Sequence, residues 1–167
     1  MFSVPLVLAS LVALSATLAA KASERAMPGV TNPAQAHQDY ILKCQGCHRP
    51  DGSGDDRSNP PMRGIVARFL TVPGGRAFIG RVPGVATVDL DDERLADLVN
   101  WTLHSFDAEH LPSDFRPYSA AEIAALRRNP IRLDRVATRA RLVEGFSSEE
   151  AKQSHIRVLV VLYATNY

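Results

Sequence analysis

The chain has 167 residues, a length that predicts one domain with at most a small appendage. Hydrophobic residues make up 46% of it, the usual share for a globular protein, which argues against global disorder. The formal net charge of +1 argues against a nucleic-acid binder that works through a strong overall positive field.

The first 22 residues are expected to form a signal peptide that lies outside the fold. Residues 2–20 are almost wholly apolar, and Ala20-Lys21-Ala22 fits the small-x-small pattern of a cleavage site. The alternative is an uncleaved membrane anchor, for which the apolar stretch is long enough but at the short end of the usual range. Both interpretations predict an exported, periplasmic protein, and cleavage would make Ser23 its first residue.

A helix is predicted to begin at Thr31-Asn32-Pro33, where a capping side chain precedes a proline in the first turn. It leads into Cys44-Gln45-Gly46-Cys47-His48, which has the spacing of c-type haem attachment. Each thiol adds to a haem vinyl group, and the adjacent His48 is then placed to coordinate the iron from one face. The sequence therefore predicts one covalently attached haem c with His48 as its proximal ligand.

Other sites that use paired cysteines fit this motif less well. A disulfide is common in exported proteins, but here a histidine follows the second cysteine at once. A thioredoxin-like redox pair does not need that histidine and would follow a strand. A zinc site would need two further ligands at suitable spacing, and the chain has no second cysteine pair.

Glycine and proline divide the next part of the chain into short segments. The glycine-rich residues 51–56 and the proline-rich residues 59–64 are predicted to form two loops. A short helix is predicted over residues 65–70, and turns are predicted at residues 73–75 and 83–84. Asp91 is expected to cap a helix over residues 92–106, whose acidic first turn suits the helix dipole.

Within that helix the apolar side chains follow helical spacing and predict an inward face. Its members are Leu95, Leu98, Val99, Thr102 and Leu103. Trp101 is interpreted as a packing residue between helices. Beyond it, Ser119 and Glu122 form a capping box that opens a helix ending near residues 129–130.

Two more helices are predicted in the C-terminal part of the chain. The first runs over residues 134–144 and stops at Gly145, and Ser147 or Ser148 caps the second. This last helix ends in the apolar run of residues 156–163, which is too short to span a bilayer. The run is therefore expected to pack on the domain or on a partner.

A helix running into Cys-x-x-Cys-His, a glycine-rich loop, a Pro-x-hydrophobic-x-Gly loop and a last helix with a central aromatic residue resemble the class I cytochrome c domain. The match covers about residues 30–107. The resemblance implies an all-α fold in which a small cytochrome c domain, residues 23–111, wraps round one haem. A helical C-terminal extension, residues 112–167, follows. The resemblance also implies that the Pro60 carbonyl accepts a hydrogen bond from Nδ1–H of His48, which would orient the ring and raise its basicity.

The distal side of the iron departs from the family pattern. There the family places a methionine, usually followed by proline, whereas Val82 precedes Pro83 in this chain and cannot bind iron. Met62 is an alternative ligand, although its position in the proximal loop favours packing against the haem. Met27 would need the N-terminal arm to cross the distal face. The candidate distal histidines are His37, His104, His110 and His155. An open or water-bound iron is the remaining alternative.

Arginines occur throughout the predicted haem-wrapping loops, namely Arg63, Arg68, Arg76 and Arg81. The guanidinium group forms bidentate charged hydrogen bonds with carboxylates, and haem carries two propionates. Arg76 and Arg81 are the favoured propionate ligands, and solvated surface charge is the alternative for each arginine.

The extension carries more basic than acidic residues, and residues 23–111 carry the reverse excess. Segment 127–141 holds most of the positive charge, at Arg127, Arg128, Arg132, Arg135, Arg139 and Arg141. Such a segment can steer an acidic redox partner toward the protein. The alternative is an ordinary solvated helix face, and a nucleic-acid partner would fit neither the haem nor the compartment.

The favoured function is carriage of single electrons between a periplasmic dehydrogenase or oxidase and another redox carrier, without a substrate and so without enzyme activity. The alternative is a haem protein with an open distal site that binds a small ligand or reacts with peroxide. Apolar Ile79, Val82 and Val85 near that site disfavour a peroxidase, because O–O cleavage needs a positioned proton donor or acceptor. A cytochrome subunit that docks on one enzyme through the extension is a third possibility.

Overall fold

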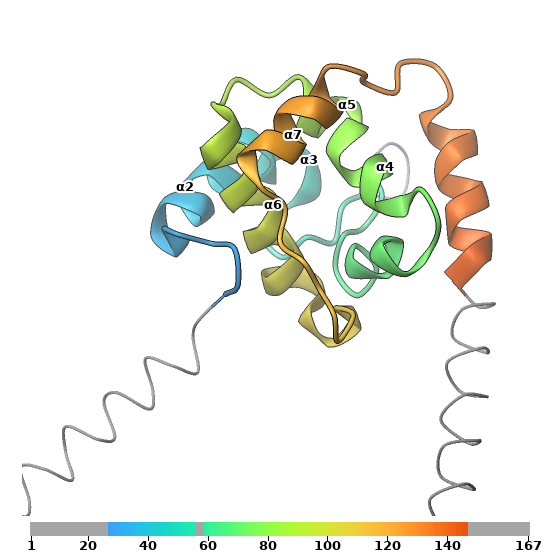
Figure 1. Cartoon of the computed structure of the whole chain (residues 1–167), viewed down its shortest axis with the longest axis horizontal. Helices are drawn as coiled ribbons and strands as arrows, with labels where there is room; N and C mark the ends of the chain where they lie inside the picture. Colours follow the sequence, from blue (N-terminus) through green and yellow to red (C-terminus); the bar gives the residue numbers. More distant parts are fainter. Residues whose placement is uncertain (1–26, 56–58, 147–167) are drawn as a thin grey trace, which may run out of the picture.

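The computed structural model describes residues 27–55 and 59–146 of the chain (Figure 1). Within these residues the structure contains helices and loops but no strand, which confirms the predicted all-α class. The helices are α2 (Pro33–Lys43), α3 (Gln45–His48), η1 (Ala67–Thr71), α4 (Gly75–Arg81), α5 (Pro83–Ala86), α6 (Asp92–Asp107), η2 (Ala108–His110), α7 (Ala120–Arg127) and a further helix over residues 135–146.

The predicted helix starts are confirmed by their capping hydrogen bonds. The side chain of Asn32 accepts from the backbone N–H of Gln35 at 3.0 Å, and Pro33 occupies the first turn of α2. The Asp91 carboxylate accepts from the backbone N–H of Arg94 at 2.8 Å and opens α6. The Ser119 side chain caps α7 in the same way. These capping hydrogen bonds fix the first residues of α2, α6 and α7.

α2 ends directly at the predicted haem-attachment motif. Cys44 is both the C-cap of α2 and the N-cap of α3, so no loop separates the two helices. α3 ends at Arg49, whose φ of 62° lies in the left-handed region and whose N–H donates to the Gln45 carbonyl. The tight junction holds both cysteines and the histidine at one end of α2.

Trp101 packs between helices, as predicted. Its ring stacks on His37 of α2 with 5.1 Å between ring centroids, and it contacts Tyr40 and the edge of Phe106. Tyr40 is fully buried. The aromatic cluster joins α2 to α6 and leaves Trp101 in the core.

One hydrophobic core extends from α2 to the C-terminal part of the chain. Its fully buried members include Tyr40, Leu95, Leu103 and Ile123. Tyr118 and Ile123 pack in the same cluster as residues of α6, although they follow residue 111. The division of the chain at residue 111 stays a prediction, and the segment just beyond it contributes to the common core.

Two predictions about local structure are confirmed, and two are wrong. The short helix predicted over residues 65–70 is present as the 3-10 helix η1, with its bounds shifted to Ala67–Thr71. The turn predicted at residues 73–75 is confirmed at residues 73 and 74, where Gly74, with φ of 84°, leads into α4. The turn predicted at residues 83–84 is wrong, because Pro83 begins α5. Both residues set the backbone geometry that precedes or opens a helix. The helix predicted to stop at Gly145 continues through residue 146.

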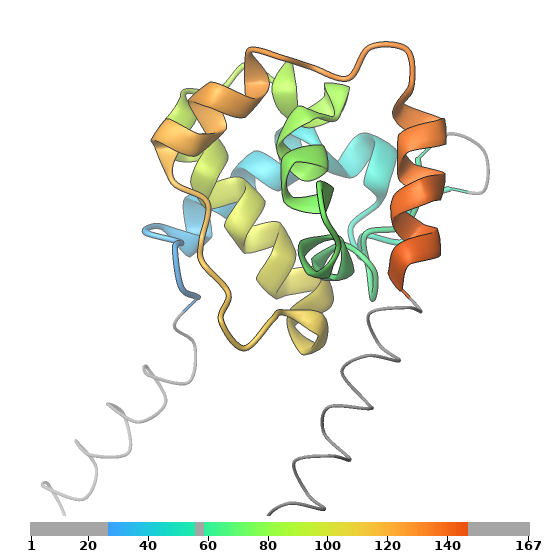
Figure 2. The ribbon, with the colours of Figure 1, turned by 45° about the vertical axis from the view of Figure 1, so that its right-hand side comes forward.

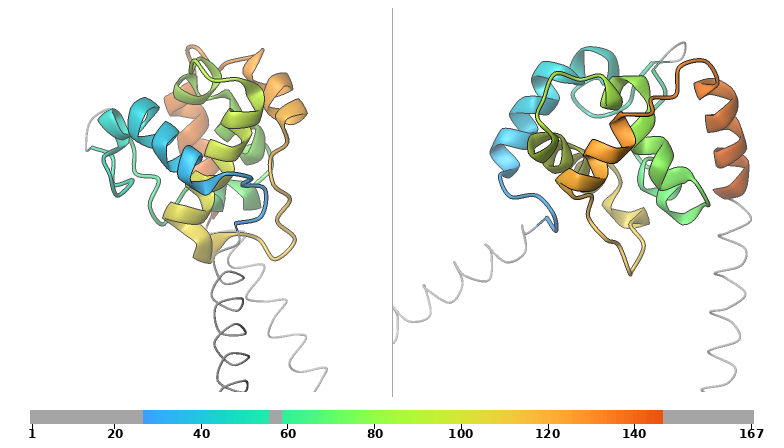
Figure 3. Two further views of the ribbon diagram at one scale, coloured as in Figure 1. Left: turned by 90° about the vertical axis from the view of Figure 1, so that its left-hand side faces the viewer. Right: turned by 45° about the horizontal axis from the view of Figure 1, so that its top comes forward.

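The helix over residues 135–146 packs on η1. It stands at the edge of the molecule in Figure 1, in Figure 2 and in the right-hand view of Figure 3. Phe146 meets Phe69 edge to face with 5.0 Å between ring centroids. A Cβ on Gly145 would lie 3.1 Å from Val72, so glycine serves close packing here instead of ending the helix.

None of the helices in the described residues has the length and apolarity needed to cross a membrane. The predicted signal peptide, the predicted last helix with its apolar run, and His155 lie outside those residues.

Candidate haem site

The predicted haem-attachment residues occupy one helical turn. The N–H groups of Cys47 and His48 both donate to the Cys44 carbonyl, at 3.1 and 2.9 Å. Residues separated by three and four positions share a face of a helix, so Cys44, Cys47 and His48 lie on the same side. Both cysteines are free thiols, Cys44 half-buried and Cys47 exposed. The donor set and its spacing fit a group attached through two thioether bonds and one imidazole.

Burial controls the protonation of this turn. It raises the pKa of the Cys44 thiol to about 11, with further contributions from Asp39 and Cys47, so Cys44 is protonated at neutral pH. Burial also lowers the pKa of His48, against an opposing effect of the Pro60 carbonyl and of Asp55. His48 is therefore held as neutral imidazole, the form that binds a metal ion.

His48 and Pro60 face each other, although they fall short of the predicted hydrogen bond. The Pro60 carbonyl lies close enough to raise the pKa of His48. Nδ1 of His48 is nevertheless buried without a partner in normal hydrogen-bond geometry. A buried ring nitrogen of this kind is costly to leave unpaired. The bond from Nδ1–H to the Pro60 carbonyl stays a prediction for the haem-bound protein.

Glycines shape the two loops that follow the motif. The N–H groups of Met62 and Arg63 donate to the Gly52 carbonyl, at 2.9 and 3.2 Å, and the Gly54 N–H donates to the His48 carbonyl. Gly52 has φ of 72°, and a Cβ there would lie 2.8 Å from the ring of Phe106. These contacts require the glycine and hold the Met62 loop against α3. Met62 is half-buried against the core, an arrangement that suits a packing role.

The Arg76 side chain forms hydrogen bonds with residues that follow residue 111. Its Nε and Nη2 donate to the two Glu122 carboxylate oxygens at 2.6 and 2.7 Å, and Nη1 donates to the Arg116 carbonyl. The guanidinium also lies 4.0 Å from the centroid of the Tyr118 ring. Glu122 raises the pKa of Arg76. This bidentate pair fastens α4 to α7, and it occupies the donors that a propionate would need.

Arg81 is held in a similar way. Its Nε donates to the Asn129 carbonyl at 2.6 Å, and its own carbonyl accepts from the Ile131 N–H at 2.8 Å. The segment after α7 is thus tied to the end of α4, next to Val82. Propionate binding by Arg76 or Arg81 stays a prediction, and the structure gives both arginines partners within the protein.

Arg127 does not belong to the predicted docking surface. It is half-buried, and its guanidinium donates to the carbonyls of Ala86, Val88 and Leu90 and to the Asp92 carboxylate. These partners lie in α5, at the start of α6 and in the loop between them. The basic segment 127–141 therefore begins with a structural arginine, which the count of positive charge in the sequence did not separate from the rest.

The distal position predicted from the family lies at a junction of two helices, not in a loop. Val82 is the C-cap of α4 and the N-cap of α5, and it packs partly buried against the core. Val85, in α5, also packs there, and Ile79 of α4 is buried. The side chains of Ile79, Val82 and Val85 are apolar and offer no iron ligand.

The described histidines other than His48 each have a partner in the protein. His37 stacks on Trp101. A ring nitrogen of His104 lies 3.2 Å from the Pro28 carbonyl, and Nδ1 of His110 donates to Asp107 at 2.5 Å. Met27, the other alternative methionine, packs partly buried against the core. None of these contacts shows a side chain held ready for the iron.

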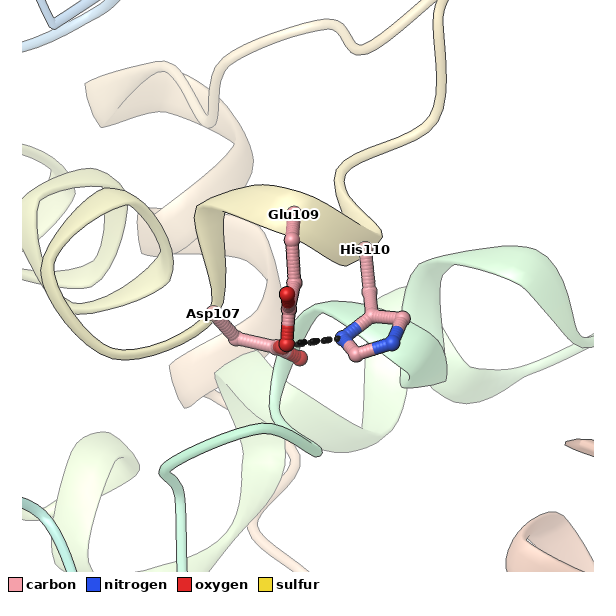
Figure 4. Close-up of side chains that lie close together, drawn as sticks. All are labelled: Asp107, Glu109 and His110. Carbon is pink, nitrogen blue, oxygen red and sulfur yellow. Dashed lines mark hydrogen bonds and ion pairs between the residues drawn. The ribbon is translucent and has the colours of Figure 1, made fainter.

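Asp107, Glu109 and His110 form a compact cluster at the end of α6 (Figure 4). One ligand atom from each lies within 4.8 Å of the others, a spacing that a metal ion would tolerate. Asp107 is buried and also accepts from the Ala67 N–H at 2.7 Å, while Nε2 of His110 lies 2.8 Å from Arg68. These bonds explain the cluster as a structural tie between η1 and η2.

The all-α fold and the Cys-x-x-Cys-His motif are consistent with a c-type cytochrome, and comparison with curated proteins finds relatives of the same class. The chain is 28% identical over 103 residues to cytochrome c-552 of Thermus thermophilus, covering 51% of this chain and 79% of that protein. A second cytochrome c-552, from a particular strain of the same species, is also 28% identical, with 70% of its length covered. No protein-family model matches the chain. The similarity supports a c-type cytochrome, and assignment to class I stays a prediction.

Proposed function

We propose that this protein is an exported c-type cytochrome that carries single electrons through one haem c. The observation that carries the proposal is the helical turn that places Cys44, Cys47 and His48 on one face. The similarity to cytochromes c-552 supports the same class. The predicted signal peptide supports export to the periplasm.

Each residue of the site has a defined task in this proposal. Cys44 and Cys47 would hold the haem covalently, and His48 would bind its iron with a ring that the Pro60 carbonyl would orient. Met62 closes the proximal side by packing. When bound, the haem supplies an iron that alternates between Fe(II) and Fe(III) without a chemical substrate.

An open distal site is the second candidate, and the apolar surroundings of Val82 favour it. An optical spectrum of the purified protein with and without carbon monoxide separates the two. A carrier with two axial protein ligands is low-spin and binds carbon monoxide slowly. A high-spin spectrum with rapid carbon monoxide binding would overturn the simple carrier and support a ligand-binding haem protein.

Met62→Ala tests whether methionine closes the distal side. Met62 packs against the core from the loop that also holds Pro60, so we expect the ferric charge-transfer band of the purified protein to be unchanged. We also expect a loss of stability of about 2–3 kcal/mol from the cavity, measured by urea unfolding. Disappearance of a methionine–iron band would instead assign Met62 as the distal ligand.

We propose further that the partner is an acidic redox protein that docks on a basic face formed by Arg128, Arg132 and Arg135. All three are at least partly exposed, and two apolar side chains between and beside them, Leu133 and Val136, are 92% and 73% exposed. Opposite charge speeds encounter, and the exposed apolar groups give the contact an area to bury.

Arg132→Glu tests this face. We expect electron transfer with an acidic redox protein to slow by about tenfold at low salt, with little effect at high salt, where charges are screened. Stopped-flow absorbance at both salt concentrations measures the rate. Arg116→Glu is the matched control, because it makes the same charge change at an exposed arginine outside the face. Equal slowing in both variants would exclude a localised docking face.

A further inference from the structure

Arg139 is the basic residue of segment 127–141 that faces inward on the C-terminal helix. On the helix over residues 135–146, the partly or fully buried positions recur at helical spacing and include Arg139, Leu142, Val143 and Phe146. The Arg139 guanidinium carbon lies 5.9 Å from the ring centroid of Phe69. A cation thus occupies the packing face of a helix that is otherwise apolar there.

This guanidinium has no anionic partner in the described part of the chain. The guanidinium contacts the Phe69 ring, and it makes no hydrogen bond or ion pair with the described residues. Burial lowers the pKa of Arg139 without an opposing charge. Arg76 is also half-buried, but its guanidinium donates to both carboxylate oxygens of Glu122.

A half-buried arginine without an anionic partner keeps its charge, so binding of an anion would stabilise it. Its pKa is too high for deprotonation to relieve the cost of burial. A cation–π contact at 5.9 Å is near the limit of useful range and phenylalanine is a weak partner. A planar carboxylate matches the fork of guanidinium donors through two parallel charged hydrogen bonds.

Arg139 lies near η1, which follows one of the loops predicted to wrap the haem. Phe69 lies in η1, which follows the Met62 loop directly, and the Val66 N–H donates to the Met62 carbonyl. Helix 135–146 packs on η1 through Phe146 and Gly145, and Figure 2 shows the helix beside this part of the fold. The two arginines favoured from the sequence, Arg76 and Arg81, already have partners.

We propose that Arg139 binds a propionate carboxylate of the haem, so that the C-terminal helix closes over the cofactor from outside the cytochrome c domain. The inference rests on the proposed function, since it needs a bound haem. It assigns the extension a part in holding the cofactor and tuning the potential, in addition to partner docking.

The test compares Arg139→Gln with Arg141→Gln in the purified holoprotein. Arg141 is exposed on the same helix, and among the described residues it donates only to the side chain of Thr138, so its loss makes the same charge change away from the packing face. Spectroelectrochemistry measures the reduction potential from acid to alkaline pH. We expect Arg139→Gln to lower the potential at neutral pH, because an unpaired propionate favours Fe(III). We also expect a new fall in potential with rising pH, as that propionate now titrates.

Arg139→Lys should restore part of the wild-type potential, since lysine keeps the charge but not the bidentate geometry. If Arg139→Gln yields no holoprotein, the Arg139→Lys protein takes its place in the comparison with Arg141→Gln. Equal potentials and pH profiles in the Arg139→Gln and Arg141→Gln proteins would overturn the proposal. So would a wild-type potential that depends on added inorganic phosphate and loses this dependence in Arg139→Gln, because the ligand would then be a free anion. Absence of covalent haem in the wild-type protein would instead refute the proposed function.

Discussion

Asn100→Ala is expected to lower the free energy of unfolding by about 3 kcal/mol or more. Asn100 is fully buried in the middle of α6. Its Nδ2 donates to the carbonyls of Gly29 and Tyr118 at 2.8 and 2.9 Å, and its Oδ1 accepts from the Tyr118 N–H at 2.8 Å. One side chain thereby joins the segments before α2 and before α7 to α6. Alanine would leave the buried N–H and carbonyl groups of Tyr118 unpaired and would remove the bond to the Gly29 carbonyl.

Urea unfolding of the ferric holoprotein measures the effect. Asn100→Asp separates hydrogen bonding from packing, because it keeps the volume of the side chain but removes both donors, and we expect it to be at least as damaging. Thr102→Ala on the same helix is the control. In the described part of the chain, Thr102 donates only to the Leu98 carbonyl within α6, so its loss should cost less than about 1 kcal/mol. A loss below about 1 kcal/mol for Asn100→Ala would show that the two segments are held by other contacts.

The start of each main helix could be predicted because capping is local. Asn32 bonds to Gln35, and Asp91 bonds to Arg94, each three residues ahead. A pattern of four residues contains both partners, so the sequence displays the interaction directly. The motif that predicts haem attachment is likewise complete within five residues, so its spacing can be seen directly in the sequence.

Glycine and proline were harder to interpret, because the same residue serves turns and helix starts. Gly74 has the left-handed backbone expected of a turn, yet α4 begins at the next residue. Pro83 is the first residue of α5, since proline costs no hydrogen bond there. Gly145 lies within a helix because Val72 approaches it. In the case of Gly145, the deciding neighbour is distant in sequence.

Long-range partners escaped prediction for the same reason. Asn100 and Gly29 are 71 residues apart, and no local pattern marks either. Arg127 and Arg128 are adjacent and identical in type, but Arg127 is bonded to carbonyls 37–41 residues away, whereas no such bond ties Arg128 to the described part of the chain. Counting arginines in segment 127–141 therefore located the positive charge without separating docking residues from structural ones.

Replacing both Cys44 and Cys47 with alanine is expected to abolish covalent haem attachment. The two thiols are the cysteines of the chain, and they flank one helical turn with His48 on the same face. A single replacement leaves one thioether and should reduce the yield of holoprotein. His48→Ala should leave both thioethers possible but remove an axial ligand, which shifts the ferric iron toward high spin.

Gly46→Ala is a control within the same turn. Gly46 has no positive φ, and a Cβ there would have no atom within 4 Å, so alanine should be accommodated. Mass spectrometry of the exported polypeptide, and absorption that remains with the protein after acid–acetone extraction, measure attachment. Covalent haem in the double cysteine variant would contradict the assignment. A loss in Gly46→Ala as large as in the double variant would show that recognition of the turn, and not its thiols, limits attachment. Retention in Gly46→Ala with loss in the cysteine variant would assign the bond to the two thiols.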